Sequence, residues 1–267
     1  MRMIRESTLN YSSPSLLLNY GIIVTMVTSA GHRHPISQMI AEINAIFAEI
    51  GFVFAEGPEA ETEVYNFDKL NVPKDHPSRD MQDTFWFKSS DTSEPMVLRT
   101  HTSPVQARYL EQHAGELPVR IIVPGKVFRN EATDATHEAQ FYQLEGLYVG
   151  EGVHLGHLKG TLEYFFSKFF SGKTEVRFRP SFFPFVEPGV EVDMRLMEGK
   201  SALAGKWIEV MGAGMVHPHV LSSAGIDPAK YSGFAFGMGV DRLGVMKYDI
   251  PDIREYYTGD LRFVNQF

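Results

Sequence analysis

The sequence predicts an α+β fold in which an antiparallel β-sheet is flanked by helices. Five segments have the apolar and aromatic character of strands, and they lie near residues 119–129, 140–149, 174–179, 190–197 and 206–213. Strands therefore outnumber the helices that a doubly wound parallel sheet would need as crossovers. No repeat, low-complexity tract or linker rich in Gly, Ser and Pro interrupts the chain after Gly31.

Helical spacing of apolar residues and end signals predict three helices, over residues 36–50, 103–113 and about 155–170. The first ends before Gly51, a residue favoured just past a helix C-terminus, and a strand over residues 52–55 follows. The second opens with Ser103 and Pro104, which fit the N-cap and the first helical position.

Composition limits the classes of function. A chain of 267 residues forms one domain or two small ones and can bury a sizeable core. Its net charge of -8 and its pI near 5.7 argue against a protein that binds nucleic acid unaided. The absence of cysteine excludes disulfides, thiolate zinc sites and a cysteine nucleophile, and it fits a reducing compartment.

The N-terminus carries Arg2 and Arg5 ahead of an apolar run over residues 16–27. This pattern fits a signal peptide or, as we favour, a strand or loosely packed extension. The run is too short, and too interrupted by polar residues, for a membrane span of about 20 apolar residues. We expect residues 1–30 to form an extension whose order the sequence leaves open, and residues 31–267 to form the core.

The stretch GKVFRNEATDATHEAQFYQLEG is typical of an antiparallel hairpin that holds a nucleotide. Arg129 can bind phosphate oxygens bidentately, Glu131 can accept hydrogen bonds from an amine, and Phe141 offers a face on which a base can stack. His137 lies in the polar loop between the strands. Each feature also has an ordinary structural explanation, as a solvated charge pair or a core aromatic residue.

Two further clusters strengthen the nucleotide hypothesis. In GFAFGMGVDR, three glycines allow the backbone to approach a ligand closely, and Arg242 follows at the start of a helix. In FFPF, Phe183 and Phe185 lie two apart and therefore share one face of an extended segment. Tight packing in the first cluster and core burial in the second are the alternatives, although packing alone does not account for Arg242.

The segments Phe128-Arg129-x-Glu131 and Gly-Met-Gly-Val-Asp-Arg242 resemble motifs 2 and 3 of the class II aminoacyl-tRNA synthetases, and residues 36–58 resemble motif 1. From about Gly31 to Phe267 the chain is similar to the catalytic core of the α subunits of bacterial phenylalanyl-tRNA synthetases. The likeness runs through EGPEAETEVYNFDKLNVPKDHPSRDMQDTFW, LRTHTSPVQ, DATHEAQFYQLEG, SFFPFVEPG, GAGMVHPHVL, GFAFGMGVDRL and DLRFVNQF.

This resemblance implies ATP-dependent activation of L-phenylalanine to phenylalanyl-adenylate. Transfer to the 2′-hydroxyl of the terminal adenosine of tRNA(Phe) would follow, with ATP as substrate and Mg²⁺ as cofactor. It implies a cytoplasmic α2β2 enzyme completed by a β subunit, which also carries the editing site. The family has a coiled-coil arm at the N-terminus, whereas residues 1–30 show no heptads, so we expect a core whose arm is missing.

The resemblance also implies roles for residues at matching positions. Three would be catalytic, namely Arg129, His137 and Arg242. Five would bind ATP, namely Arg129, Glu131, His137, Phe141 and Arg242. Ten would bind phenylalanine, namely His101, Ser103, Gln106, Gln143, Glu145, Phe183, Phe185, Val186, Ala235 and Gly237. Glu209 would hold Mg²⁺, because oxygen ligands suit that ion, although a paired strand carboxylate is the alternative.

Two other functions stay open at this point. The chain could be a stand-alone paralogue that adenylates an amino acid for an acceptor other than tRNA, which the acidic balance favours. It could also be a nonenzymatic regulator that binds an amino acid or a nucleotide. The presence of both Arg129 and Arg242 argues against the regulator, because a sensor of phenylalanine alone would need neither arginine.

Overall fold

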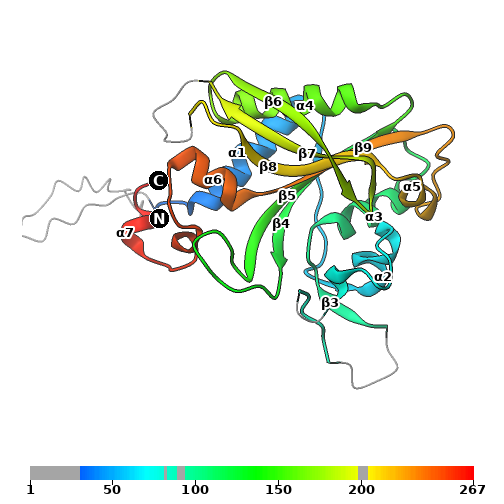
Figure 1. Cartoon of the computed structure of the whole chain (residues 1–267), viewed down its shortest axis with the longest axis horizontal. Helices are drawn as coiled ribbons and strands as arrows, with labels where there is room; N and C mark the ends of the chain where they lie inside the picture. Colours follow the sequence, from blue (N-terminus) through cyan, green and yellow to red (C-terminus); the bar gives the residue numbers. More distant parts are fainter. Residues whose placement is uncertain (1–30, 81–82, 89–93, 198–203) are drawn as a thin grey trace, which may run out of the picture. The chain divides into compact units, whose positions relative to one another are not determined.

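The computed structural model describes residues 31–80, 83–88, 94–197 and 204–267 (Figure 1). The expected N-terminal extension, residues 1–30, lies outside the described residues. The α-helices are α1 Pro35–Glu49, α2 Glu63–Asn66, α3 Ser103–Gln112, α4 Leu155–Phe169, α5 Pro218–Ser223, α6 Val240–Tyr248 and α7 Leu261–Val264. The 3-10 helices are η1 Asp68–Leu70, η2 Pro77–Arg79 and η3 Ile253–Tyr256. The strands are β1 Val53–Phe54, β2 Ala60–Thr62, β3 Met96–Leu98, β4 Val119–Phe128, β5 Gln140–Gly150, β6 Thr174–Phe183, β7 Val186–Leu196, β8 Ile208–Val216 and β9 Ser232–Gly239.

The main sheet confirms the predicted fold class. Its seven strands lie in the order β1-β4-β5-β9-β8-β7-β6, and all pairs from β4 onward are antiparallel. The two-residue strand β1 pairs in parallel with β4 at one edge, so the sheet is mixed. Strand β1 can pair in parallel with β4 because the connection between them is long and includes β2, β3 and α3. The five strand segments predicted between residues 119 and 213 correspond to β4 to β8.

Strand β9 was not predicted, although it lies in the middle of the sheet between β5 and β8. Its sequence, SGFAFGMG, is rich in glycine, which weakens a strand in isolation. Pairing partners on both sides compensate for that low propensity. At Gly237 a Cβ would lie only 3.0 Å from Gln143 Nε2 and 3.1 Å from Glu145 Cγ, so glycine here admits two side chains of β5.

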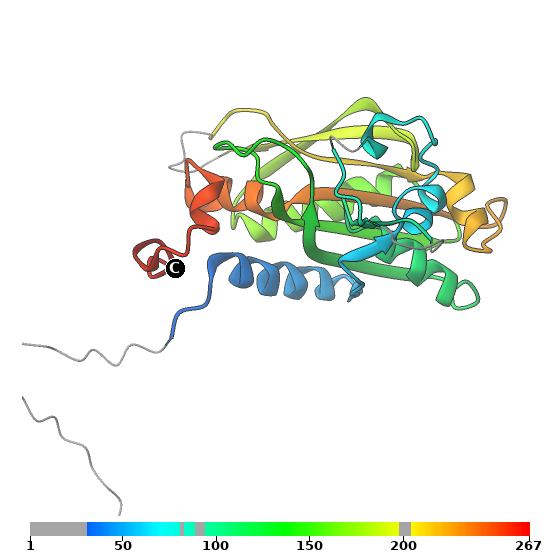
Figure 2. The same cartoon turned by 90° about the horizontal axis from the view of Figure 1, so that it is seen from below.

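One face of the sheet is covered by α1, α4 and α6, and in Figure 2 α1 runs along this side. The helix predicted from residue 36 is confirmed as α1, and Gly51 follows it with a φ of +82°. Phe47 of α1 is fully buried, with ring centroids 4.9 Å from Phe165 and 5.6 Å from Phe236. This aromatic stack joins α1, α4 and β9 into the main core.

The opposite face is covered only in part, by α3 and α5, which bury a second apolar cluster against β4 and β5. In Figure 2 α2 and α5 gather at the end of the sheet remote from the C-terminal helices. Successive side chains of a strand point to opposite faces of the sheet, so neighbouring residues of one strand contact different layers. On β5, Leu144 enters the main core, whereas Glu145 faces the partly covered side.

Two glycine substitutions test this packing because their surroundings differ. A Cβ at Gly146 would lie 2.1 Å from Phe236 Cζ, in the aromatic stack, whereas a Cβ at Gly160 in α4 meets nothing within 4 Å. We expect Gly146→Ala to lower the free energy of unfolding by about 1–3 kcal/mol through overpacking. Gly160→Ala should raise it by about 0.5–1 kcal/mol, because alanine favours a helix interior. Urea unfolding of both variants measures this, and shifts of the same sign would contradict the described packing.

Candidate active site

Two adjoining cavities open on the partly covered face of the sheet. The first has a volume of about 470 Å³ and the second about 410 Å³. They share a boundary formed by the residues that line both, namely Arg129, Glu131, Gln143, Phe183, Gly212 and Gly237. We call them the apolar lobe and the charged lobe, because aromatic and aliphatic side chains dominate the first, whereas two arginines and five carboxylates line the second. A ligand with an apolar end and a charged end could therefore extend through both lobes.

A buried carboxylate anchors the apolar lobe. Glu145 on β5 is 4% exposed. Its Oε1 accepts a hydrogen bond from the backbone N–H of Thr102 at 3.1 Å. Its Oε2 accepts hydrogen bonds from Ser103 Oγ at 2.6 Å and from Gln106 Nε2 at 2.9 Å. Burial raises the pKa of Glu145 to about 7, and the hydrogen bonds from Ser103 and Thr102 oppose that rise. A positively charged group in this lobe would hold the carboxylate ionised.

Two buried polar atoms of this lobe have no partner within the described residues, namely His101 Nδ1 and Gln143 Oε1. Buried polar atoms are normally hydrogen-bonded, so unpartnered ones that line a cavity indicate a ligand. Burial, together with the charges of Arg129 and Arg99, lowers the pKa of His101 to about 3. His101 is therefore a neutral imidazole near pH 7. Both residues line the same lobe as Glu145.

The aromatic part of the lobe comes from the β6–β7 hairpin. Phe183 and Phe185 lie with ring centroids 6.1 Å apart and planes at 17°. The Phe183 ring packs over Gly212 of β8, where a Cβ would lie 2.8 Å from its Cζ. Val186 is buried, and Ala235 of β9 lines the same wall. All ten residues predicted to bind phenylalanine line this lobe, and Ser103 and Gln106 also donate hydrogen bonds to Glu145.

The charged lobe combines two arginines with an aromatic face. The guanidinium of Arg129 lies 5.1 Å from the Phe141 ring centroid, and its Nε donates to Thr100 O at 3.3 Å. Burial lowers the pKa of Arg129, which nevertheless stays charged at neutral pH because an arginine starts so high. Arg242, exposed in the first turn of α6, donates through Nη1 to Glu209 O at 3.4 Å. Glu131 is exposed at the boundary of the two lobes.

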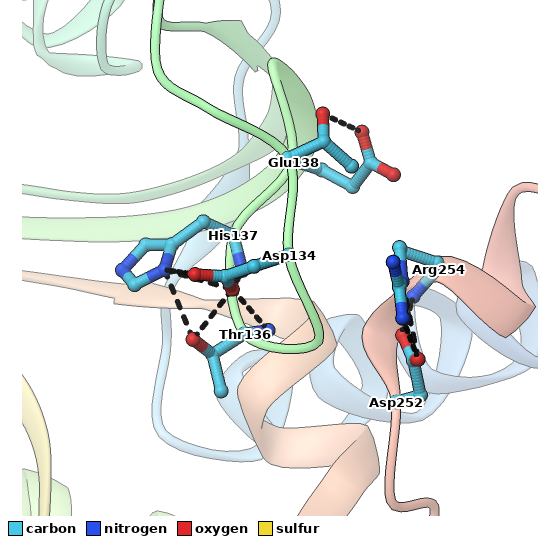
Figure 3. A network of polar contacts seen from close by, with 7 residues as sticks. Asp134, Thr136, His137, Glu138, Asp252 and Arg254 are labelled. Carbon is cyan, nitrogen blue, oxygen red and sulfur yellow. Dashed lines mark hydrogen bonds and ion pairs between the residues drawn. The ribbon is translucent and has the colours of Figure 1, made fainter.

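His137 lies in the loop between β4 and β5, where Asp134 orders the backbone (Figure 3). Asp134 Oδ1 accepts hydrogen bonds from the backbone N–H groups of Thr136 at 2.7 Å and His137 at 2.9 Å. The hydrogen bonds from Thr136 hold the pKa of Asp134 well below its usual range. His137 Nδ1 lies 3.1 Å from the same carboxylate, and its ring lines the charged lobe. The ring is about half exposed, so it can meet an incoming anion.

Glu209 lines the charged lobe, but Arg179 Nη2 donates to its Oε2 at 3.0 Å. Arg179 also pairs with Glu191 of the same lobe at 2.8 Å. No group of three or more His, Asp or Glu side chains in the part of the chain that the structure describes is arranged to hold a metal ion. A cation here would therefore need oxygens from its ligand as well as from the protein.

Two buried charges at the site escaped the sequence analysis. Arg99 is 4% exposed and donates to the backbone carbonyls of Lys126 at 2.7 Å and Gly57 at 3.0 Å. Asp241, 3% exposed, precedes Arg242. An arginine inside the LRTHTS stretch and an acid beside a site arginine were the available signals. Neither signal says that the side chain points inward.

Titration of Glu145 gives a testable dependence of stability on pH. Its pKa rises from 4.5 to about 7 on folding, so the folded state holds a proton that the unfolded state has released. This contribution to stability is present below pH 4.5 and is lost as the pH rises to about 7, by about 3 kcal/mol at most. We expect the unfolding free energy of the wild type to fall relative to that of Glu145→Gln as the pH rises from 5 to 8. Parallel pH curves would contradict the assignment.

Known proteins resemble this chain both in sequence and in fold. The family model described as "tRNA synthetases class II core domain (F)" matches residues 19–267. The phenylalanine–tRNA ligase alpha subunit of Shouchella clausii is 54% identical over 242 residues, which cover 89% of this chain and 69% of that protein. The protein of the same name from Bacillus subtilis is 52% identical over 244 residues, which cover 90% of this chain and 70% of that protein.

A solved structure, the pyrrolysyl-tRNA synthetase of Desulfitobacterium hafniense, matches with a TM-score of 0.65. The match covers 85% of this chain and 74% of that one at 18% identity, which supports the fold alone. Over the described residues, no helix is both long enough and apolar enough to cross a membrane. The family model and the relatives above half identity together establish that this chain belongs to the class II aminoacyl-tRNA synthetases, in the family of the phenylalanine–tRNA ligase alpha subunits.

Proposed function

We propose that this chain activates L-phenylalanine with ATP and transfers the phenylalanyl group to the 2′-hydroxyl of the terminal adenosine of tRNA(Phe). It would act in the cytoplasm as the α subunit of an α2β2 enzyme, with residues 31–267 as the catalytic core. The observation that carries the proposal is the pair of adjoining lobes. One offers a buried carboxylate beside an aromatic wall, and the other offers two arginines beside a stacking face.

The apolar lobe suits a phenylalanine zwitterion. The ammonium group would donate to Glu145 and to the unpartnered Oε1 of Gln143. A neutral His101 can donate a hydrogen bond to the carboxylate without adding a positive charge beside the ammonium. The phenyl ring would lie against Phe183 and Phe185, where each aromatic pair contributes about 0.5–1.5 kcal/mol beyond burial. Val186, Ala235 and Gly237 would shape the remaining wall.

The charged lobe suits ATP. Arg129, at the boundary of the lobes, would hold the α-phosphate against the amino-acid carboxylate, which attacks phosphorus in line. His137 and Arg242 would contact the outer phosphates, Phe141 would stack on adenine, and Glu131 would accept from the adenine amino group. No protein nucleophile is required. Catalysis would come from positioning and electrostatic stabilisation of the charge that develops on the phosphate oxygens.

Glu209 is our candidate ligand for Mg²⁺, with Glu191 beside it in the charged lobe. Carboxylate oxygens suit this ion, which is usually held by one or two carboxylates together with substrate phosphates. When bound, it would neutralise charge on the phosphates. Arg179, which pairs with both glutamates, occupies these oxygens in the structure and would have to release them.

The acidic composition of this chain supports the part of the proposal that includes a β subunit. Phosphate affinity comes mostly from lysine and arginine, whereas this chain has 25 such residues against 33 acidic ones. Most contacts to tRNA would therefore come from a partner. The printed names of the relatives, which designate an alpha subunit, support an assembly of unlike chains.

Phenylalanine-dependent ATP–pyrophosphate exchange tests the function. We expect exchange when a bacterial β subunit is added to this chain, little or none from the chain alone, and none with tyrosine in either case. Exchange by the chain alone would favour a self-sufficient adenylating paralogue. No exchange under either condition, with an intact and folded chain, would overturn the proposal.

The role of Arg242 has its own test in the same assay. We expect Arg242→Ala to reduce exchange by roughly 100-fold or more, because it removes a preorganised positive charge from the phosphates. Phenylalanine binding, measured by calorimetry, should stay unchanged, because Arg242 does not line the apolar lobe. Arg262→Ala, which removes an arginine 91% exposed on α7, is the matched control. Normal exchange in Arg242→Ala, or lost phenylalanine binding, would remove this residue from its assigned role.

A further inference from the structure

Asp241 occupies the point where strand β9 becomes helix α6. The β5–β9 ladder ends with the pair Gln143 and Gly239. The next residue of β5, Tyr142, has no strand partner on that side, because Val240 already lies in the helix. Its backbone N–H donates instead to Asp241 Oδ2 at 2.9 Å. The carboxylate therefore continues the ladder by one position and joins the segment Phe141–Gln143 to the start of α6.

The other oxygen of the same carboxylate reaches the C-terminal segment. Asp241 Oδ1 accepts a short hydrogen bond from the hydroxyl of Tyr257, which directly follows η3. This segment also contacts the loop between β4 and β5, since the backbone N–H of Ile253 donates to Ala135 O at 3.1 Å. Ile253 and Pro251 line the charged lobe. The residues after α6 thus form one wall of that lobe, and the Tyr257–Asp241 hydrogen bond holds this segment against α6.

Tyr256, the neighbour of Tyr257, is buried, but its hydroxyl does not hydrogen-bond to Asp241. It is 3% exposed, and its hydroxyl packs against Gly244 of α6, where a Cβ would lie 2.1 Å from the oxygen. Among the residues that the structure describes, this hydroxyl has no hydrogen-bond partner. The two adjacent tyrosines differ in burial, since Tyr256 is buried and Tyr257 only partly so, and only the Tyr257 hydroxyl hydrogen-bonds to Asp241.

The two hydrogen bonds to Asp241 compensate for the burial of its carboxylate. Burial raises the pKa of Asp241, and the hydrogen bonds from Tyr257 and Tyr142 oppose that rise. A buried carboxylate that loses one of its donors is left partly uncompensated, and the surrounding structure then shifts to admit water or a new partner. Asp241 joins the Phe141 segment to the first turn of α6, which carries Arg242, so such a shift would displace one relative to the other.

We propose that Asp241 and Tyr257 are positioning residues for the nucleotide: together they fix the adenine-stacking segment of β5 relative to Arg242. This inference rests on the proposed function, since it assumes that the charged lobe receives ATP. Neither side chain needs to touch the reacting atoms. The C-terminal segment, through a single tyrosine hydroxyl, becomes part of the ATP site.

Adjacent phenylalanine substitutions test the inference on the assembled α and β subunits. Tyr257→Phe should weaken ATP binding about tenfold in calorimetry and raise the KM for ATP similarly, as expected for loss of a hydrogen bond to a charged group. The KM and Kd for phenylalanine should stay unchanged. Tyr256→Phe, the matched control, should alter neither substrate. Asp241→Asn keeps one acceptor for Tyr142 and offers one donor to the Tyr257 hydroxyl, so it should retain most of the ATP affinity, whereas Asp241→Leu should not.

The outcomes separate this inference from the proposed function. If the wild type binds no ATP, the proposed function fails and this inference fails with it. If the wild type binds ATP but Tyr257→Phe and Tyr256→Phe behave alike, only the inference is overturned. Equal losses for ATP and phenylalanine in Tyr257→Phe would show a general structural role and would also overturn it. Near-native melting of the variants before binding establishes that they are folded.

Discussion

The buried carboxylate of Glu145 is the interaction on which the rest of the site depends. Its three hydrogen bonds reach the backbone and side chains at the N-terminus of α3, so one residue of β5 fixes where that helix meets the sheet. Removing a donor would leave a buried charge uncompensated, which is why such a cluster holds its geometry. Because α3 is placed in this way, its approach leaves the apolar lobe open between the helix and the β6–β7 hairpin. The sheet provides the floor, and the carboxylate sets the distance to one wall.

Glycines set how closely the remaining walls approach. Gly212 on β8 receives the ring of Phe183, and Gly237 on β9 leaves room for the side chains of Gln143 and Glu145. On the other face of the same sheet, Gly146 receives Phe236, which stacks on Phe47 of α1. Missing side chains on adjacent strands thus admit rings from both sides. The core and the cavity are coupled for this reason, since a shift of β5 or β9 would disturb both.

Much of this arrangement could be predicted from the sequence, and the failures have a common cause. Strands β4 to β8 and helices α1, α3 and α4 follow from local periodicity and end signals, which are properties of short segments. The residues expected to bind phenylalanine could be named in advance because their motifs could be matched one by one. Strand β9 was missed because its stability comes from pairing with β5 and β8, which are distant in the sequence, and not from its own glycine-rich sequence. The parallel pairing of β1 and the inward direction of Arg99 and Asp241 depend likewise on distant contacts, which no local pattern encodes.

The charges that line the two lobes bear on how an acidic chain would hold the anionic nucleotide of the proposed function. Burial, together with the charges of Arg129 and Arg99, lowers the pKa of His101 to about 3, and Arg99 also favours ionised Glu145. Arg129 places a positive charge at the boundary of the lobes and Arg242 places another in the charged lobe, although the net charge of the chain is -8. A zwitterionic amino acid placed there would supply an ammonium to Glu145 and a carboxylate to the arginine side. It would also reach His101 Nδ1 and Gln143 Oε1, which have no partner within the described residues. In the proposed function, the substrate would then complete a hydrogen-bond network that the described residues leave incomplete, so binding and orientation would come from the same contacts.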